Sequence, residues 1–293
     1  MDTKYWGPSG WRLLHLIAEK EASIENMVEI YWETLHRPFW AILPYILPCK
    51  FCRASLTTYY EKYPIPHDNR EMGRWLYKIH NCVNAKLRSQ GQAVQPAPPY
   101  SVVKKHYRSM LDQGCTELTF PGWEFLFCIA DNYPGSAPSV PMPDAPAVVD
   151  GLDQASKNKY NLLTAKERID YLGRFWAVLG SVMPFQEWRD AFGEYCGGPR
   201  ECMRDFRGSR AAKARLWQIK CDLEKSLGKK AEKSYYDLCR VVASKRSGCS
   251  SSARARTCRA APASAKALAS AKAQASARLT RSQKTLKKKH DKK

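Results

Sequence analysis

The chain has 293 residues and a formal charge of +20, which is long enough for two ordinary domains and a tail. The charge is uneven, because residues 245–293 hold 15 Lys and Arg against one acid, so that +14 lies there and +6 in the rest. No apolar run is long enough to span a bilayer, and the N-terminus lacks the basic-then-apolar pattern of a secretory signal. Membrane-spanning and secreted classes are therefore excluded, and we expect a soluble protein of the cytosol.

Helical periodicity dominates the first 112 residues, and no stretch shows the alternation of a half-buried strand. We expect a first helix from Ser9 or Gly10 and a second helix capped by Ser23. The second helix should turn one face to the core, formed by Met27, Ile30, Tyr31, Thr34 and Leu35. Two more helices follow, and a short fifth spans about Ser101 to Asp112. The sequence predicts an all-α bundle of four helices plus a short fifth.

The first predicted helix places a histidine among apolar neighbours. Trp11, Leu14, His15 and Ala18 recur at i, i+3, i+4 and i+7, which puts them on one face. A single histidine in such a stripe is usually a hydrogen-bonded core residue, although it can also contact a cofactor.

A Cys-x-x-Cys sequence follows Pro48. The proline ends the apolar run from Phe39 to Leu47 and allows a new helix to begin. Cys49 and Cys52 are then spaced i,i+3 near a helix N-terminus, where the unpaired backbone amides favour a thiolate. The alternative is half of a zinc site, which requires a second Cys-x-x-Cys or a His pair at suitable spacing. None follows, so redox use is favoured and no metal is expected.

The next helix carries an imidazole and two amides. His80, Val83, Asn84 and Leu87 share a face with Leu76, and Asn81 lies beside Asn84. Polar groups on a core-facing stripe are costly unless they are hydrogen-bonded. A planar cofactor rich in heteroatoms could satisfy them, whereas a partly exposed helix is the simpler alternative.

Taken together, these three segments resemble the Erv/ALR family of flavin-dependent sulfhydryl oxidases. That family has an aromatic–Leu-His segment in its first helix, Pro-Cys-x-x-Cys at the start of its third, and His-Asn-x-Val-Asn-x-x-Leu in its fourth. The same order and comparable separations occur here over about residues 1–112. The long basic extension and the lack of a leader peptide resemble the versions of large DNA viruses, particularly mimivirus relatives.

The resemblance implies a helical bundle that holds FAD, normally as a homodimer. It also implies a reaction that moves two electrons from protein dithiols through the Cys-x-x-Cys to flavin and then to O₂, giving hydrogen peroxide. In this comparison Cys52 corresponds to the flavin-proximal sulfur and Cys49 to the outer sulfur. Tyr107 is placed against the adenine, with Lys105 or His106 near the phosphates. The other positions that correspond to cofactor contacts are Trp11, His15, His80, Asn81, Val83, Asn84 and Lys86. The family's structural disulfide in the following segment is in doubt, because no cysteine lies between Val83 and Gly114.

The resemblance ends near Gly114, and a second all-helical domain is expected over residues 114–244, after an oxidase domain of residues 1–113. A buried helix is predicted at Trp123 to Ala130, followed by a proline-rich loop from Pro134 to Pro146. Four amphipathic segments follow, Ala165 to Val182, Phe185 to Tyr195, Ser209 to Leu227 and Lys230 to Ala243. Their core residues should be Phe175, Trp176, Trp188, Phe192 and Trp217.

The remaining cysteines offer a second redox pair. Cys196 and Cys202 flank Gly-Gly-Pro, and such a pair could relay electrons to the dithiol, as family members often do. Cys115 with Cys128 is the weaker candidate, and either pair could instead be structural. Cys82, Cys221 and Cys239 are expected to be packed thiols.

The tail of residues 245–293 lacks Trp, Tyr and Phe, cannot build a core, and is expected to be disordered. It is either a solubilising terminus or a phosphate-binding segment for nucleic acid without sequence preference.

The leading interpretation is an FAD-dependent thiol oxidase that forms disulfides in proteins in the cytoplasm of an infected host cell, with packaging into the virion as a further option. The rivals are a nucleic-acid-binding helical protein that acts through its tail, and a dithiol isomerase without flavin.

Overall fold

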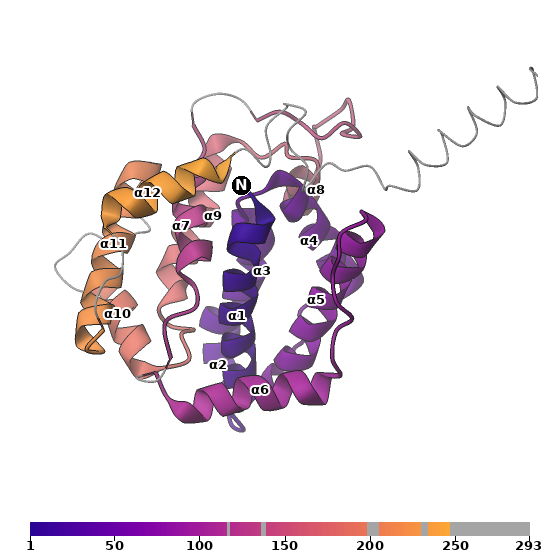
Figure 1. Ribbon diagram of the computed structural model, residues 1–293. Coiled ribbons are helices and arrows are strands. Elements are labelled where there is room, and N and C mark those ends of the chain that lie inside the picture. Colours follow the sequence, from indigo (N-terminus) through magenta and orange to yellow (C-terminus); the bar gives the residue numbers. More distant parts are fainter. Residues whose placement is uncertain (116–117, 136–138, 198–204, 230–233, 247–293) are drawn as a thin grey trace, which may run out of the picture. The chain divides into compact units, whose positions relative to one another are not determined.

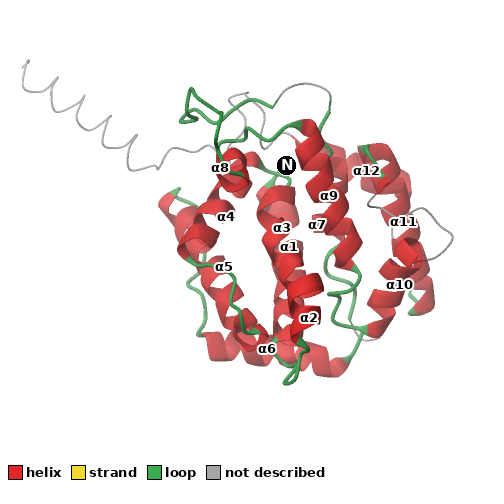
Figure 2. Cartoon of the chain, turned by 180° about the vertical axis from the view of Figure 1, so that it is seen from behind, coloured by secondary structure: helices red, strands yellow, loops and turns green. Residues whose placement is uncertain are grey.

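The structure is a computed structural model that describes residues 1–115, 118–135, 139–197, 205–229 and 234–246, with the side chains of 194–197 left out. All regular structure in these ranges is helical, which confirms the all-α prediction (Figure 2). No helix in the described ranges is both long and apolar enough to cross a membrane. The elements are α1 (Thr3–Glu21), α2 (Glu29–Tyr31), the π-helix η1 (Trp32–His36), α3 (Arg37–Ile46), α4 (Lys50–Lys62), the 3₁₀-helix η2 (Asn69–Glu71), α5 (Met72–Ser89), α6 (Tyr100–Gln113), α7 (Trp123–Asp131), α8 (Gln154–Lys159), α9 (Ala165–Leu179), α10 (Gln186–Gly197), α11 (Ser209–Ser226) and α12 (Tyr235–Ser244).

The chain contacts define two compact units. The first consists of Met1–Cys82 with Ala97–Cys258 and holds the hydrophobic core. The second contains Val83–Pro96, the last turns of α5 and the segment after them. In this second unit the helix ends in a turn, where Gln92 N donates to Leu87 O at 3.0 Å and Gly91 adopts a φ of 76°.

The first helix begins earlier than its sequence suggests. The glycines and Pro8 predict a start at Ser9 or Gly10, but α1 begins at Thr3, where the Asp2 side chain accepts from the Lys4 amide at 3.0 Å. This is a correction, and packing against α7 explains it, because the Trp6 and Phe125 rings stack 5.7 Å apart. A Cβ on Gly10 would lie 3.1 Å from the Phe125 ring, so a glycine here allows the helices to approach closely.

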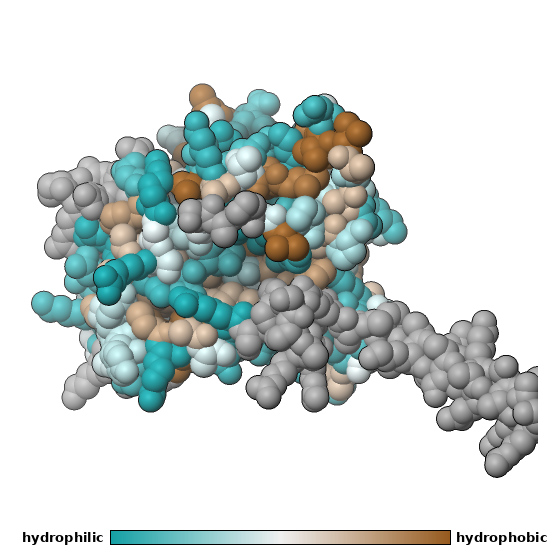
Figure 3. All heavy atoms as spheres, turned by 90° about the horizontal axis from the view of Figure 1, so that it is seen from above, coloured by the Kyte–Doolittle hydropathy of each residue, from teal (hydrophilic) through white to brown (hydrophobic). Residues whose placement is uncertain are grey.

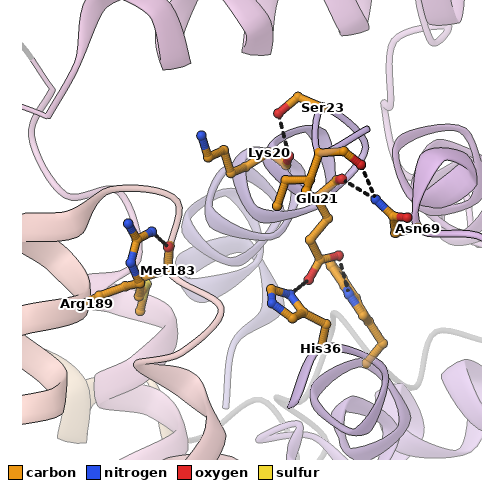
Figure 4. Close-up of polar contacts among 9 residues, drawn as sticks. Lys20, Glu21, Ser23, His36, Asn69, Met183 and Arg189 are labelled. Atoms are coloured by element: carbon orange, nitrogen blue, oxygen red, sulfur yellow. Dashed lines mark hydrogen bonds and ion pairs between the residues drawn. The ribbon is translucent and has the colours of Figure 1, made fainter. Parts of the chain in front are cut away.

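Ser23 does not cap a second helix. Its hydroxyl donates to Lys20 O at the end of α1, and the Asn69 amide donates to the carbonyls of Glu21 and Ile24 at 2.7 and 3.0 Å (Figure 4). These bonds hold residues 22–28 in a turn, and the helix starts only at Glu29. The prediction was wrong because the serine satisfies a carbonyl of the preceding helix instead of an amide of the next one.

The predicted face of this second helix is wrong in large part, since of its apolar members Met27 packs partly buried against the core but Ile30 and Tyr31 do not. Ile30 and Tyr31 are 64% and 57% exposed, whereas Trp32, Phe39 and Trp40 are buried. In η1 the π-helical hydrogen bonds enclose one more residue per turn than in an α-helix. The side chains after it therefore face a different direction than a regular helix would give them. The buried Glu21 carboxylate fixes this arrangement, accepting from His36 Nδ1 and Trp40 Nε1 at 2.7 Å each. Figure 4 shows His36 pointing at Glu21 from the side opposite Asn69.

The region after Gly114 packs directly on the helices that precede it. Helix α7 lies against α1, with α11 and α12 on its other side (Figure 1), and α9 packs on α3. Phe39 of α3 and Phe175 of α9 stack at 6.0 Å. The predicted core residues Phe175, Trp176, Trp188 and Phe192 are buried, and Trp217 packs partly buried against the same core. Residues on both sides of Gly114 therefore share one hydrophobic cluster.

The predicted helices of this region occur with shifted ends, and the described parts of the proline-rich segment, residues 134–135 and 139–146, contain no helix, as expected. The short helix α8 was missed, because six residues carry too little periodicity to reveal it. Asp131 of α7 accepts from Lys213 of α11 and from Arg246, which follows α12, each at 2.5 Å. These two cations lower the pKa of Asp131 despite its burial.

Candidate functional site

The dithiol lies at the N-terminus of α4, as the sequence predicts. Cys49 is the N-cap residue with extended backbone angles, and its carbonyl accepts from the amides of Cys52 and Arg53, both at 3.0 Å. The amides of a first helical turn carry partial positive charge and favour a thiolate, which opposes the effect of burial on Cys49. Cys49 is completely buried, whereas Cys52 is half-buried.

Four aromatic side chains from three helices form a second group, the ring cluster. Trp11 and His15 come from α1, His80 from α5 and Tyr107 from α6. Trp11 stacks on His80 with centroids 4.0 Å apart and planes 9° from parallel. His15 stacks on Tyr107 at 4.9 Å, and its Nε2 lies 3.1 Å from Nδ1 of His80. Residues distant in sequence thus meet in two stacked pairs, with the His15 ring tilted by 42° from the His80 ring.

Both imidazoles of the ring cluster are neutral at pH 7. Burial lowers the pKa of His15 to about 3, helped by the neighbouring His80, and burial lowers the pKa of His80 to about 4. Only one of two neutral rings donates across the contact between them. Whichever it is, Nδ1 of His15 is buried and has no hydrogen-bond partner among the described residues. Such an atom is costly unless a further group pairs with it, so it marks a place where a heteroatom of a ligand would bind.

A buried carboxylate fixes helix α6, which carries Tyr107. Glu19 is fully buried and accepts from the Tyr100 hydroxyl at 3.0 Å and from Arg108 Nε at 3.3 Å. A Cβ on Gly73 of α5 would lie 2.3 Å from the same carboxylate, so that glycine makes room for the contact. Three helices of the ring cluster therefore converge on Glu19.

Glu19 was missed in the sequence, although a signal exists. Trp11, His15 and Glu19 follow each other at i, i+4 and i+8, so an acid continues the stripe of the ring cluster. Gly73 inside a helical pattern is a second signal, because a glycine there often marks close approach.

Tyr59 of α4 packs partly buried against the hydrophobic core. Its pKa is raised by burial and, to a smaller extent, by the nearby thiols of Cys52 and Cys82. Cys52 is three residues from Cys49, and Cys82 is two residues from His80. The flavin-proximal position expected for Cys52 stays a prediction.

The other predicted cofactor positions follow His80 on α5. Asn81 is half-buried in the first unit. Val83, Asn84 and Lys86 are half-buried in the second unit, and their contact with a cofactor stays a prediction. Lys105 and His106, expected near the phosphates, are exposed on α6.

The predicted shuttle pair of Cys196 and Cys202 lies outside the described side chains, as does the basic tail from residue 247. Cys115 and Cys128, the weaker candidate, are separate buried thiols. Burial raises the pKa of Cys115 to about 11 and that of Cys128 to about 12, so neither is poised to react as a thiolate. Cys82, Cys221 and Cys239 are half-buried on helices, in agreement with packed thiols.

Comparison with known proteins identifies relatives of the part of the chain that holds the dithiol and the ring cluster. Residues 8–108 match the model of the Erv1/Alr family. The chain is similar to an FAD-linked sulfhydryl oxidase of African swine fever virus from a Kenyan isolate, at 34% identity over 89 residues, which cover 29% of this chain and 71% of that protein. The relative from a Malawian isolate is 33% identical with the same coverage.

A similar relation holds to a cellular protein. The mitochondrial FAD-linked sulfhydryl oxidase ERV1 of Saccharomyces cerevisiae is 34% identical over 88 residues, covering 30% of this chain and 45% of the yeast protein. The search of solved structures gave no significant match. The matched residues contain the dithiol and the whole ring cluster, and they extend over most of the viral relatives. The chain therefore belongs to the Erv1/Alr family.

Proposed function

We propose that this protein is an FAD-linked sulfhydryl oxidase that forms disulfide bonds in other proteins. The observation that carries the proposal is the ring cluster of neutral, stacked side chains from α1, α5 and α6. The dithiol at the N-terminus of α4 supplies the redox group. Relatives that bear the name FAD-linked sulfhydryl oxidase support the same activity.

The residues present fit FAD. Nδ1 of His15 is buried without a partner among the described residues, and the polar edge of a flavin nucleotide offers donors and acceptors for it. Trp11, His80 and Tyr107 present flat faces on which a planar ring can stack. The low pKa values of His15 and His80 keep the ring cluster uncharged, so an apolar ring system would not be opposed by a buried cation.

The dithiol carries out thiol exchange. In the disulfide form, a substrate thiolate attacks the Cys49 sulfur, the Cys49–Cys52 bond breaks, and Cys52 leaves as a thiolate. A second substrate thiolate then attacks the mixed disulfide, the substrate leaves as a disulfide, and Cys49 leaves with the electron pair. The helix amides stabilise the thiolate and so make it a better leaving group.

Bound FAD would supply a two-electron acceptor that regenerates the Cys49–Cys52 disulfide and passes the electrons to O₂, which becomes hydrogen peroxide. Two substrate thiols and one O₂ thus give one disulfide and one hydrogen peroxide. On the protein side, Trp11, His15, His80 and Tyr107 would bind and orient the ring, and Asn81, Val83, Asn84 and Lys86 would add further contacts. Glu19 would hold Tyr107 in place through α6.

The proposal also covers the oligomeric state, the cellular location and the domain organisation of the protein. We include a homodimer, as in the family, and the cytoplasm of an infected cell, to which the viral relatives point. The organisation into an oxidase domain of residues 1–113, a second domain of residues 114–244 and a basic tail also belongs to the proposal. The shared core indicates that the first two are one folding unit despite this division.

The test is direct. Purified protein should carry the flavin absorption band, and it should consume oxygen and release hydrogen peroxide when given dithiothreitol. A folded, colourless protein that does not gain the band when FAD is added would overturn the proposal. A colourless protein that moves thiols between proteins would support the isomerase, and one that only binds nucleic acid would support the tail-driven alternative.

A further inference from the structure

The outer cysteine of the dithiol is covered by the protein itself. Cys49 is buried completely by the chain's own atoms, and Cys52 is more accessible. Thiol exchange requires that an attacking thiolate reach the sulfur in line with the bond that breaks. Some part of the chain therefore has to move before a substrate meets Cys49, and the contacts of α4 indicate which part.

Cys49 lies on the buried face of α4. Cys49, Arg53, Leu56 and Thr57 follow at i, i+4, i+7 and i+8, which places them along one side. All four are buried. Arg53 NH1 donates to Leu47 O, so the end of α3 covers part of this side.

The rest of this side is covered by residues 139–161, which we call the cover. Arg53 NH2 donates to Asn161 Oδ1 at 2.7 Å, and Asn158 Nδ2 donates to Thr57 Oγ1 at 2.9 Å. Lys50, the residue after Cys49, donates through Nζ to the carbonyl of Val140 at 3.1 Å. The start of the cover is therefore bonded to Lys50, between the two cysteines, and its end is bonded to Arg53 and Thr57, which follow Cys52.

The two ends of the cover are also joined to each other. Asn161 Nδ2 donates to Val140 O at 2.8 Å, and the Met142 amide donates to Tyr160 O at 2.9 Å. Asn161 adopts a φ of 58°, a left-handed conformation that Asn tolerates better than most residues. One asparagine thus links Arg53 of α4 with both ends of the cover.

The middle of the cover lies at the surface. Val148 is 71% and Val149 38% exposed. Figure 3 looks down on the side where this loop runs and shows hydrophobic patches between hydrophilic ones. The cover lies after residues 8–108, the part of the chain that matches the family model. It therefore belongs to the part of this chain that the family model does not match.

We propose that the cover determines which thiols reach Cys49, and that detachment of Asn161 and Asn158 from α4 is the step that admits a protein substrate. This inference rests on the proposed oxidase function for its role in specificity. A bulky substrate needs a larger opening than a small dithiol. The cover therefore discriminates against folded proteins and favours thiols on flexible segments.

The experiment weakens the cover and measures access to Cys49. Asn161→Gly removes both side-chain bonds and keeps a residue suited to a positive φ. Asn158→Ala removes the bond to Thr57 and also the bond from Asn158 Nδ2 to Pro44 O of α3. The matched control is Lys159→Ala, which lies between them and loses only a surface ion pair with Glu61. Anaerobically reduced holoenzyme is treated with iodoacetamide, and trypsin then separates Cys49 from Cys52 by cleavage after Lys50.

We expect Cys49 labelling to accelerate about tenfold in Asn161→Gly and Asn158→Ala, a factor that corresponds to about 1.4 kcal/mol, on the order of one hydrogen bond. Lys159→Ala should label like the wild type. Cys128, fully buried in α7, serves as the internal control and should stay protected in every variant. With oxygen consumption as the second measurement, kcat/KM for reduced ribonuclease A should rise more than kcat/KM for dithiothreitol.

A variant that unfolds would expose Cys128 as well, so labelling of the wild type in low urea provides the second test. Local opening of the cover should make Cys49 labelling nearly independent of urea, whereas Cys128 labelling should follow global unfolding. The proposal is overturned if both cysteines follow the same urea dependence, or if folded variants protect Cys49 as the wild type does. Because labelling needs no turnover, these outcomes stand even if the protein proves not to be an oxidase.

Discussion

Residues 8–108 and residues 118–246 contribute to the protein in different ways. The first region holds the dithiol and the ring cluster and matches a known family. The second contains α7 and α9, which pack on α1 and α3, and the cover, which is bonded to α4. The helices that carry the chemistry are thus positioned from outside the region that matches. The end of a family match is therefore not the end of a folding unit.

The largest effect is expected within the first region. Cys49→Ser and Cys52→Ser should each reduce dithiothreitol oxidation to background, since exchange needs both sulfurs. FAD should stay bound, because the ring cluster does not include a thiol. Only Cys49→Ser should show a long-wavelength absorption band, from an unpaired Cys52 thiolate beside the flavin. A band in Cys52→Ser instead would reverse the two assignments.

The view that residues 118–246 position the helices of residues 8–108 would be wrong if residues 8–108 folded independently. We expect Phe175→Ala to lower the free energy of unfolding by about 3–5 kcal/mol, since it removes a fully buried ring that stacks on Phe39. Urea unfolding followed by circular dichroism and by flavin release should shift together, because both regions share one core. Tyr236→Ala, at a 74% exposed position, is the control and should change little. Two separate transitions would show independent domains.

The neutral ring cluster should make stability depend on pH. The folded pKa of His80 is about 4 against an ordinary 6.5, so the unfolded chain binds the proton first. Its contribution is fully present above about pH 6.5 and is lost as the pH falls toward 4, at about 1.4 kcal/mol per pH unit. His80→Gln should therefore show a shallower loss of unfolding free energy between pH 6 and 5, measured in urea. The exposed His67 provides the control His67→Gln, which should follow the wild type. Equal slopes for all three proteins would contradict the assignment.

A smaller effect is expected from the carboxylate that fixes α6. Glu19→Gln keeps the shape of the side chain but weakens its bonds with Tyr100 and Arg108. We expect FAD affinity to fall about tenfold, or about 1.4 kcal/mol, with little change in turnover at saturating FAD. Glu33→Gln, which alters only a surface pair with Arg37, is the matched control. Loss of turnover with unchanged FAD affinity would mean that Glu19 does not act through Tyr107.

The smallest effect is expected from the tail. Deletion of residues 247–293 should leave dithiothreitol oxidation unchanged, because all residues of the site lie before it. The deletion begins after Arg246, since this residue is bonded to Asp131 and its removal would disturb α7. Any binding of nucleic acid should disappear with the tail, and in the full chain it should weaken linearly with salt on a log–log plot. Nucleic-acid binding that persists after deletion would place it on the folded part.

The sequence by itself determined the helical class, the helix start at the dithiol and the helix faces that carry Trp11, His15 and His80, whereas Tyr107 was placed only by the family resemblance. These features follow from neighbouring residues alone. Pro48 ends one helix before the dithiol, and a spacing of four residues places two side chains on the same face of a helix. Trp11 and His15 could be placed on one side of a helix before any partner for them was known. The family resemblance rests on the same short segments.

Only the tertiary structure decided where α1 begins, what Ser23 bonds to, and what covers Cys49. Pro8 and Gly10 suggest that no helix continues through these residues. The packing of Trp6 and Gly10 against Phe125 nevertheless stabilises α1 from Thr3 onward. Arg53 and Asn161 are 108 residues apart in the chain, and nothing local to either one specifies their bond. Contacts of this kind depend on how buried faces fit together across the whole chain, and a local pattern does not contain that information.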